Sequence, residues 1–287
     1  MNGRILPLRQ RIPFGIIILG VFLFAIYLPV FVELVDDWER DSNYSHGFLV
    51  PLVSLFLLWR KRKEFAHIPT QSTPLGLGAI AAGLFLLLVG TAGAEYFTVR
   101  LSFVILLFGL VWYFGGTRVA KAVSFPIWYL ILAIPIPYVI YFAAAFPLQV
   151  LGTKITASLL HLIGLPCIRQ GNIIHLQGYS LEVVEACSGL RSLVSLLALS
   201  GVYAYLTQKT TLKKLILFAS AVPIALIANI FRIFITALGA YAISPKLAED
   251  FLHELSGLLV FVVSFICLFI FGAILKRIGT KKTPAAS

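Results

Sequence analysis

A polar segment, VVEACSGLRSL at residues 183–193, interrupts an otherwise apolar sequence and places a cysteine among polar side chains. Glu185, Cys187, Ser188 and Arg191 fall within seven residues of one another. Ser188 is a plausible N-cap for the following helix, and the positive end of a helix dipole lowers the pKa of a nearby thiol. Arg191, at i+4, adds positive charge on the same helical face. Both effects favour the nucleophilic thiolate at Cys187, while a buried structural cysteine is the alternative.

Two further residues could serve such a thiolate. Arg232 lies in the apolar run AVPIALIANIFRIFITALGAY, where an arginine costs several kcal/mol unless it faces a protein interior or water. Asn229, about one turn earlier, could hold the guanidinium in place. His253 precedes the last apolar run in EDFLHELSG, and Ser256-Gly257 after it are small enough to permit close approach of another helix.

Cys187, Arg232 and His253 together could perform cysteine-based acyl transfer. A thiolate attacks a carbonyl, an imidazole moves protons, and a fixed cation stabilises the developing oxyanion. His46, in NYSHGFLVP, is a rival for the imidazole. The sequence contains no Gly-rich phosphate loop and no HExxH motif, and its three cysteines form no CxxC pair, so we expect neither a cofactor nor a metal. Cys267, within an apolar run, is expected to pack.

Composition shows which elements must position these residues. Of 287 residues, 60% are hydrophobic and 12% charged, and the mean hydropathy is +0.96. A soluble domain needs far more charge to cover its surface. Apolar runs close to the roughly 20 residues that cross a bilayer recur along the chain. The sequence therefore predicts an all-α, polytopic membrane helical bundle.

We expect about eight transmembrane helices, at residues 14–34, 46–60, 75–93, 99–115, 119–135, 188–206, 214–242 and 252–275. An insert at 136–187 separates the fifth from the sixth, and the prolines of IPIPY at its start disfavour a continuing helix. Residues 138–165 are predicted to form an interfacial or re-entrant helix. NIIHLQGYSLEVVEA predicts a short extracytoplasmic β-hairpin around Gln177-Gly178.

The distribution of charge favours one of two topologies. Lys and Arg cluster at residues 4–11, 60–63, 118–121, 209–214 and 276–282, whereas most acidic residues lie in the other loops. If 138–165 does not cross, every basic cluster and both termini lie in the cytoplasm. If it crosses, the clusters at 209–214 and 276–282 lie outside. The positive-inside rule favours the first layout, and it explains the net charge of +11 without a nucleic-acid partner.

This layout predicts a basic cytoplasmic N-terminus at 1–13, one membrane-embedded domain at 14–275 and a basic cytoplasmic tail at 276–287. It also brings the candidate site to one leaflet. Cys187 and His253 open their spans at the outer ends, and Arg232 lies ten residues, or about 15 Å, before the outer end of its own span.

The motifs EACSGLRSL at 185–193, NIFR at 229–232 and HELSG at 253–257 resemble, in this order, the Cys, Arg and His motifs of the exosortase/archaeosortase family. SHGFLVPLVSLFLLWRKR at 45–62, PIPY at 135–138 and GNIIHLQGYSLEV at 171–183 are also similar to that family. The resemblance extends over residues 36 to 275 and is closest to the bacterial exosortase type.

The resemblance implies an enzyme of the bacterial cytoplasmic membrane whose active site faces the extracytoplasmic side. Its partners would be membrane-anchored proteins with a C-terminal sorting signal, which consists of a PEP-type motif, a transmembrane helix and a basic cluster. Cys187 would form a thioester, His253 would act as general acid and base, and Arg232 would stabilise the oxyanion. The released protein would pass to a cell-surface polysaccharide or lipid acceptor.

Two other functions are alternatives. A non-enzymatic component of exopolysaccharide assembly or export would use the same polar residues to line a path for lipid-linked sugars. A proton-coupled transporter is disfavoured, because no Asp or Glu lies in the middle of a predicted span.

Overall fold

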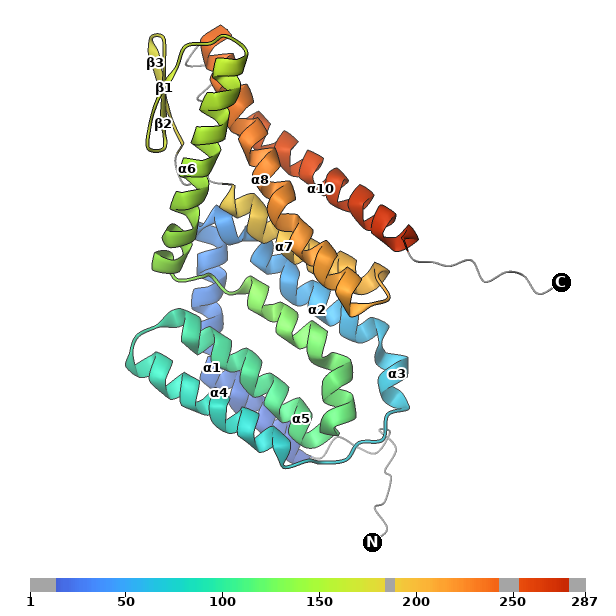
Figure 1. Cartoon of the computed structure of the whole chain (residues 1–287). Helices are drawn as coiled ribbons and strands as arrows, with labels where there is room; N and C mark the ends of the chain where they lie inside the picture. The colour runs from blue at the N-terminus through green and yellow to red at the C-terminus, as the bar shows by residue number, and fades with distance from the viewer. Residues whose placement is uncertain (1–13, 184–188, 243–252, 279–287) are drawn as a thin grey trace, which may run out of the picture. The chain divides into compact units, whose positions relative to one another are not determined.

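The computed structural model describes residues 14–183, 189–242 and 253–278, with the backbone alone at 253–256. The chain forms two compact units, Met1–Pro137 and Tyr138–Ser287 (Figure 1). Seven helices of the described part are long and apolar enough to cross a membrane. The predicted polytopic helical fold is therefore confirmed.

All regular elements in the described part of the first unit are helices. Its elements are α1 (Phe14–Arg40), η1 (Ser42–Phe48), α2 (Leu49–Arg60), α3 (Arg62–Ala66), α4 (Leu75–Ala92), α5 (Tyr96–Tyr129) and η2 (Leu130–Ala133).

The number of long helices differs from the expected eight for two reasons. The predicted spans at 99–115 and 119–135 correspond to two helices that meet at a kink at the non-helical Gly116 (φ 81°), and Tyr96–Ala133 counts as one of the seven. Helix α2 has 12 residues, about 18 Å, which is short for a crossing. Conversely, α6 (Tyr138–Leu162) is a continuous helix of 25 residues, and its length and composition also suit a crossing.

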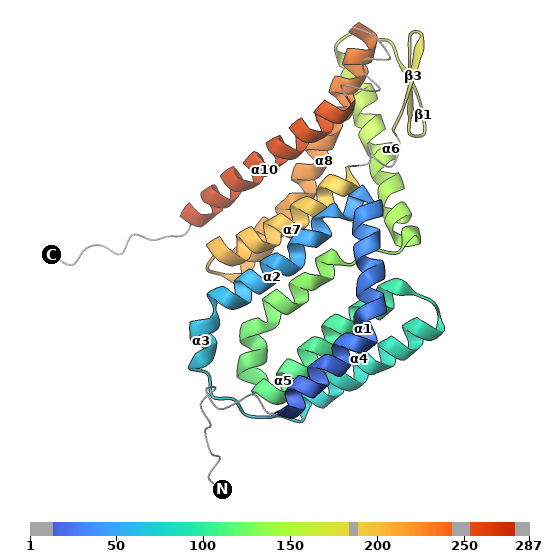
Figure 2. The ribbon, with the colours of Figure 1, turned by 180° about the vertical axis from the view of Figure 1, so that it is seen from behind.

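Glycines set the close packing of α4 on α5, which run side by side in Figures 1 and 2. Gly76, Gly83 and Gly90 recur every seven residues along one face of α4, and each is buried. A Cβ added to Gly83 would lie 2.9 Å from the Leu106 backbone nitrogen, and one on Gly109 of α5 would lie 2.7 Å from the Ile80 nitrogen. Small residues let helix backbones approach where the surrounding lipid provides no hydrophobic drive for association.

The second unit combines helices with a small sheet. Its elements are α6, β1 (Ile168–Gln170), β2 (Ile173–Leu176), β3 (Tyr179–Glu182), α7 (Leu190–Thr207), α8 (Thr211–Ala242) and α10 (His253–Arg277). The chain is non-helical between Ala133 and Tyr138, as the prolines of IPIPY predict.

The predicted hairpin is confirmed. Strands β2 and β3 pair antiparallel with Leu176 opposite Tyr179, which leaves Gln177-Gly178 as the turn. Gly178 has φ 79°, a conformation that glycine adopts without strain. Strand β1, which was not predicted, pairs antiparallel with β2 and completes a three-stranded sheet.

Helix α8 is the central element of the second unit. Its first half packs with α7 and α10 around Leu196, Leu217, Ala221 and Leu268. Its second half packs, through Ile233 and Ala237, against α6 and the sheet, where Ala157, Leu160 and Ile174 are buried.

Two contacts join the C-terminal end of α7 to α10. The Tyr203 ring stacks on Phe269, and Gln208 Nε2 donates a hydrogen bond to Gly272 O at 3.1 Å. Cys267 is exposed on α10, so the expectation that it packs is wrong. An apolar helix in a bilayer presents such residues to lipid without a penalty.

Candidate active site

The start of α7 meets α8 at Gly189 and Asn229. Gly189 is buried, precedes the first residue of α7 and has φ 76° and ψ −1°. A Cβ added to Gly189 would lie 2.8 Å from both Cβ and Cγ of Asn229. Asn229 is only 2% exposed. Glycine is therefore required at 189 both by the left-handed backbone and by the close approach of α8.

The start of α10 meets the same face of α8 one turn later. A Cβ added to Gly257 would lie 3.4 Å from Arg232 Nη2 and 3.6 Å from Arg232 Cζ. The guanidinium therefore lies over the backbone of the first turns of α10, which begins at His253. Since this is an ordinary van der Waals distance to a side chain, close approach of the two helices at Gly257 stays a prediction.

Because residues three apart on a helix share a face, α8 presents Asn229 to the start of α7 and Arg232 to the start of α10. Gly189 follows Cys187 by two residues, a separation that peptide geometry limits to about 7 Å. Gly257 follows His253 by four residues, one turn of the same helix. The described starts of α7 and α10 thus both contact one turn of α8, at Asn229 and Arg232.

Four of the predicted site residues lie wholly or partly outside the described part of the chain. Glu185, Cys187 and Ser188 fall in 184–188, and only the backbone of His253 is described.

The predicted cap of α7 is wrong. The N-cap is Gly189, with no side-chain capping bond, and not Ser188, because the chain enters the helix through the left-handed conformation that glycine favours. The i,i+4 relation between Cys187 and Arg191 does not apply either, since α7 begins only at Leu190. Arg191 is the second residue of α7, and it is exposed.

His46 belongs to the first unit, where its ring is half-buried in η1. Its Nε2 donates a hydrogen bond to Leu132 O at 3.1 Å. Burial lowers the pKa of His46 below its usual value, and the bond to Leu132 opposes that effect.

The second unit contains another pair of a thiol and an imidazole, at Cys167 and His161. Cys167 Sγ lies 3.4 Å from His161 Nε2, but that nitrogen also bonds Cys167 O at 2.8 Å. Since a carbonyl only accepts, Nε2 carries the proton and has no lone pair with which to deprotonate the thiol. Burial raises the pKa of Cys167. This free cysteine is therefore a structural thiol.

Helix α6 adds a buried polar stripe that sequence reasoning missed. Gln149, Thr153 and Thr156 are each at most 3% exposed on the face that contains Gly152, whose added Cβ would lie 3.0 Å from Ile233 Cδ1 on α8. Thr153 Oγ1 donates toward Gly171 O at 3.1 Å and so joins α6 to the sheet. The four-residue spacing of 149 and 153 in an apolar helix was the available signal.

Within the described ranges, no group of three His, Cys, Asp or Glu side chains could hold a metal ion. The described geometry places Asn229 of α8 against the start of α7 and the Arg232 guanidinium against Gly257 of α10. A family model of transmembrane exosortases matches residues 38–270. The chain belongs to the transmembrane exosortase family. The matched range includes Cys187, Arg232 and His253. No curated protein and no solved structure gives a significant match to this exosortase.

Proposed function

We propose that this exosortase is a membrane cysteine protease and transpeptidase. It would cleave the C-terminal sorting signal of surface-destined proteins through a thioester at Cys187. The observation that supports this proposal is the double contact of α8, Asn229 with Gly189 and Arg232 with Gly257. Gly189 follows Cys187 by two residues, and Gly257 follows His253 by four, so both contacts lie close in sequence to the proposed catalytic residues.

The roles follow from the chemistry of acyl transfer. The Cys187 thiolate attacks the scissile carbonyl carbon, and the carbonyl oxygen gains negative charge beside Arg232. When the peptide C–N bond breaks, protonated His253 donates a proton to the leaving amine. The neutral imidazole then removes a proton from the acceptor nucleophile, which attacks the thioester and releases Cys187. With water as acceptor the result is hydrolysis, and with a hydroxyl or amine it is transfer.

Helix lengths support a site at the membrane surface. From its contact with Asn229 to its other end, α7 has 18 residues, about 27 Å. From its contact with Arg232 to its other end, α10 has the 21 residues Gly257–Arg277, about 31 Å. Each length approximates the hydrocarbon core of roughly 30 Å. This argues for an Arg232 near the surface rather than about 15 Å deep, with the second half of α8 and much of α6 at the headgroups and beyond.

The basic residues support the same orientation. Lys213 Nζ donates a hydrogen bond to Ile278 O, which holds the start of α8 at the end of α10. Lys209, Lys214, Lys276 and Arg277 lie at these same helix ends, opposite the candidate site. By the positive-inside rule this end is cytoplasmic, so the site would face the extracytoplasmic side of the bacterial inner membrane.

Substitution of the nucleophile tests the mechanism. Cys187→Ala should leave the protein in the membrane and abolish processing of a co-expressed substrate that carries the sorting signal, measured by the mobility of the substrate on a gel. Cys267→Ala, at an exposed cysteine, is the matched control and should process normally. Normal processing by Cys187→Ala would refute the thioester mechanism.

The oxyanion role of Arg232 has a separate test. Arg232→Lys keeps the charge but lacks the planar guanidinium, so processing should fall severely. Retained activity would reassign Arg232 to a structural role.

A thiol reagent that does not cross membranes separates this proposal from a non-enzymatic role in exopolysaccharide export. Applied from outside to a Cys167→Ala/Cys267→Ala protein, the reagent should label Cys187 and block processing together. Labelling without loss of function would favour the export role.

A further inference from the structure

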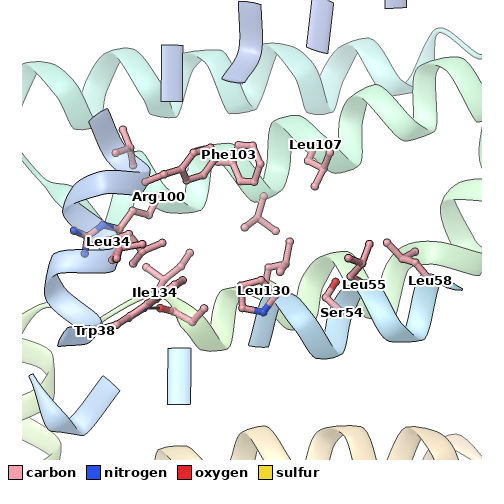
Figure 3. Close-up of a pocket in the computed structure, with 16 residues that line it drawn as sticks. Leu34, Trp38, Ser54, Leu55, Leu58, Arg100, Phe103, Leu107, Leu130 and Ile134 are labelled. Atoms are coloured by element: carbon pink, nitrogen blue, oxygen red, sulfur yellow. Dashed lines mark hydrogen bonds between the residues drawn. The ribbon is translucent and has the colours of Figure 1, made fainter. Parts of the chain in front are cut away.

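An apolar groove crosses the first unit, away from the residues discussed above. It has a volume of about 480 Å³ and is lined by α1, α2, α5 and η2. In Figure 3, Phe103 and Leu107 of α5 lie on one side, and Leu55, Leu58 and Leu130 lie on the other. The volume falls within the range of roughly 300–1,000 Å³ that is usual for small-molecule sites.

The polar groups along this groove are already bonded within its walls. Ser54 Oγ donates a hydrogen bond to Pro126 O at 2.8 Å, and Trp38 Nε1 donates one to Ala133 O at 2.8 Å. Neither donor is left to bond a ligand, and the remaining lining is almost entirely hydrocarbon. The body of the ligand must therefore be hydrocarbon as well.

One end of the groove differs, because Arg100 lines it (Figure 3). Arg100 is 5% exposed, and its Nη1 lies 2.7 Å from Asp37 Oδ2. Its Nε is buried and has no hydrogen-bond partner among the described residues. A buried guanidinium nitrogen without a partner is costly unless a ligand supplies an acceptor.

Carboxylates with solvent access lie at the same end. The Asp37 side chain is 45% exposed despite its bond to Arg100. Asp36, the preceding residue of α1, is 50% exposed and lies 3.5 Å from Arg40. This end therefore offers a buried donor for an anion and, outside it, acceptors for a cation.

We propose that this groove binds one acyl chain of a phospholipid whose headgroup carries both a phosphate and an ammonium group. The phosphate accepts from Arg100 Nε, and the ammonium lies against Asp36 and Asp37. The acyl chain runs along α5 toward Leu107. No step of peptide processing is involved, so this site is independent of the proposed catalytic mechanism.

Two exposed leucines of α2 provide a matched pair of variants. Leu55 lines the groove and is 65% exposed, and Leu52 does not line it and is 63% exposed. Purified full-length Leu55→Trp and Leu52→Trp proteins are compared by native mass spectrometry with added phosphatidylethanolamine and phosphatidylglycerol of identical chains. Neither substitution enters the packed core, so both variants should fold.

The wild-type protein and Leu52→Trp should retain one phosphatidylethanolamine in preference to phosphatidylglycerol, and Leu55→Trp should lose it by about tenfold or more. Asp37→Asn/Arg100→Gln, which replaces the ion pair by a neutral polar pair, should abolish the preference between the two lipids. Equal retention by the two tryptophan variants would overturn the groove as the site. Equal retention of the two lipids by the wild type would overturn the headgroup assignment.

A photocrosslinker identifies the occupant directly. Benzoylphenylalanine at position 55, but not at 52, should acquire the mass of one phospholipid upon irradiation in liposomes. A crosslink at position 55 to a peptide helix or to a second copy of the chain would overturn the proposal.

Discussion

Replacement of Gly189 by alanine tests whether α8 positions the start of α7. The substitution has two structural consequences. Alanine at φ 76° suffers the left-handed penalty of about 1–2 kcal/mol. Its Cβ would also lie 2.8 Å from Cβ and Cγ of Asn229, which forces α7 and α8 apart at an overpacking cost of about 1–3 kcal/mol. The expected loss of folding free energy is therefore about 2–5 kcal/mol.

Gly164→Ala separates the two contributions. Gly164 has φ 82°, but a Cβ there would meet nothing within 4 Å, so only the left-handed penalty of about 1–2 kcal/mol applies. The two glycines belong to the same compact unit. The difference between the variants, about 1–3 kcal/mol, isolates the contact with Asn229.

Two measurements read out this difference. Thermal unfolding in detergent should place Gly189→Ala below Gly164→Ala by about 2–4 °C per kcal/mol of difference. Processing of a substrate with a sorting signal should fall by about 10–100-fold in Gly189→Ala alone, because displacement of the chain next to Cys187 by a fraction of an ångström misaligns the attack. Equal stability of the two variants, with normal processing by Gly189→Ala, would refute the close approach and its role in positioning Cys187.

Three further predictions concern other contacts. Gly257→Ala places its Cβ at an ordinary van der Waals distance, 3.4 Å from Arg232 Nη2, and should stay active. The larger side chain of Gly257→Leu should displace the guanidinium and lower kcat for processing at least tenfold. Equal activity of the two variants would refute the contact. Gly83→Ala brings a Cβ to 2.9 Å from the Leu106 nitrogen and should lower stability in thermal unfolding by about 1–3 kcal/mol, while Gly78→Ala, on an open face of α4, should not. His46 has a lowered pKa, so the unfolded state binds its proton first and stability should fall as pH drops below about 6.5. His46→Gln should reduce that slope in unfolding curves, and an unchanged slope would show that other groups dominate.

The sequence by itself determined the fold class and the three motifs. Apolar runs of spanning length admit only helices in a bilayer, because every backbone polar group must be bonded within its own segment. The hairpin at Gln177-Gly178 and the helix end at IPIPY were also predictable, since turn glycines and prolines act locally. Arg232 could also be singled out from the sequence, because it is a charged residue within an apolar run.

Only the tertiary structure decided which residues meet. Gly189 is 40 residues from Asn229 in the sequence, yet the approach of α8 leaves no room for a side chain at position 189, which is the N-cap of α7 in place of the expected Ser188. The unpartnered Nε of Arg100 and the groove beside it likewise depend on how α1, α2 and α5 pack. Local patterns specify helices and turns, but a contact between distant helices depends on packing that no single segment encodes.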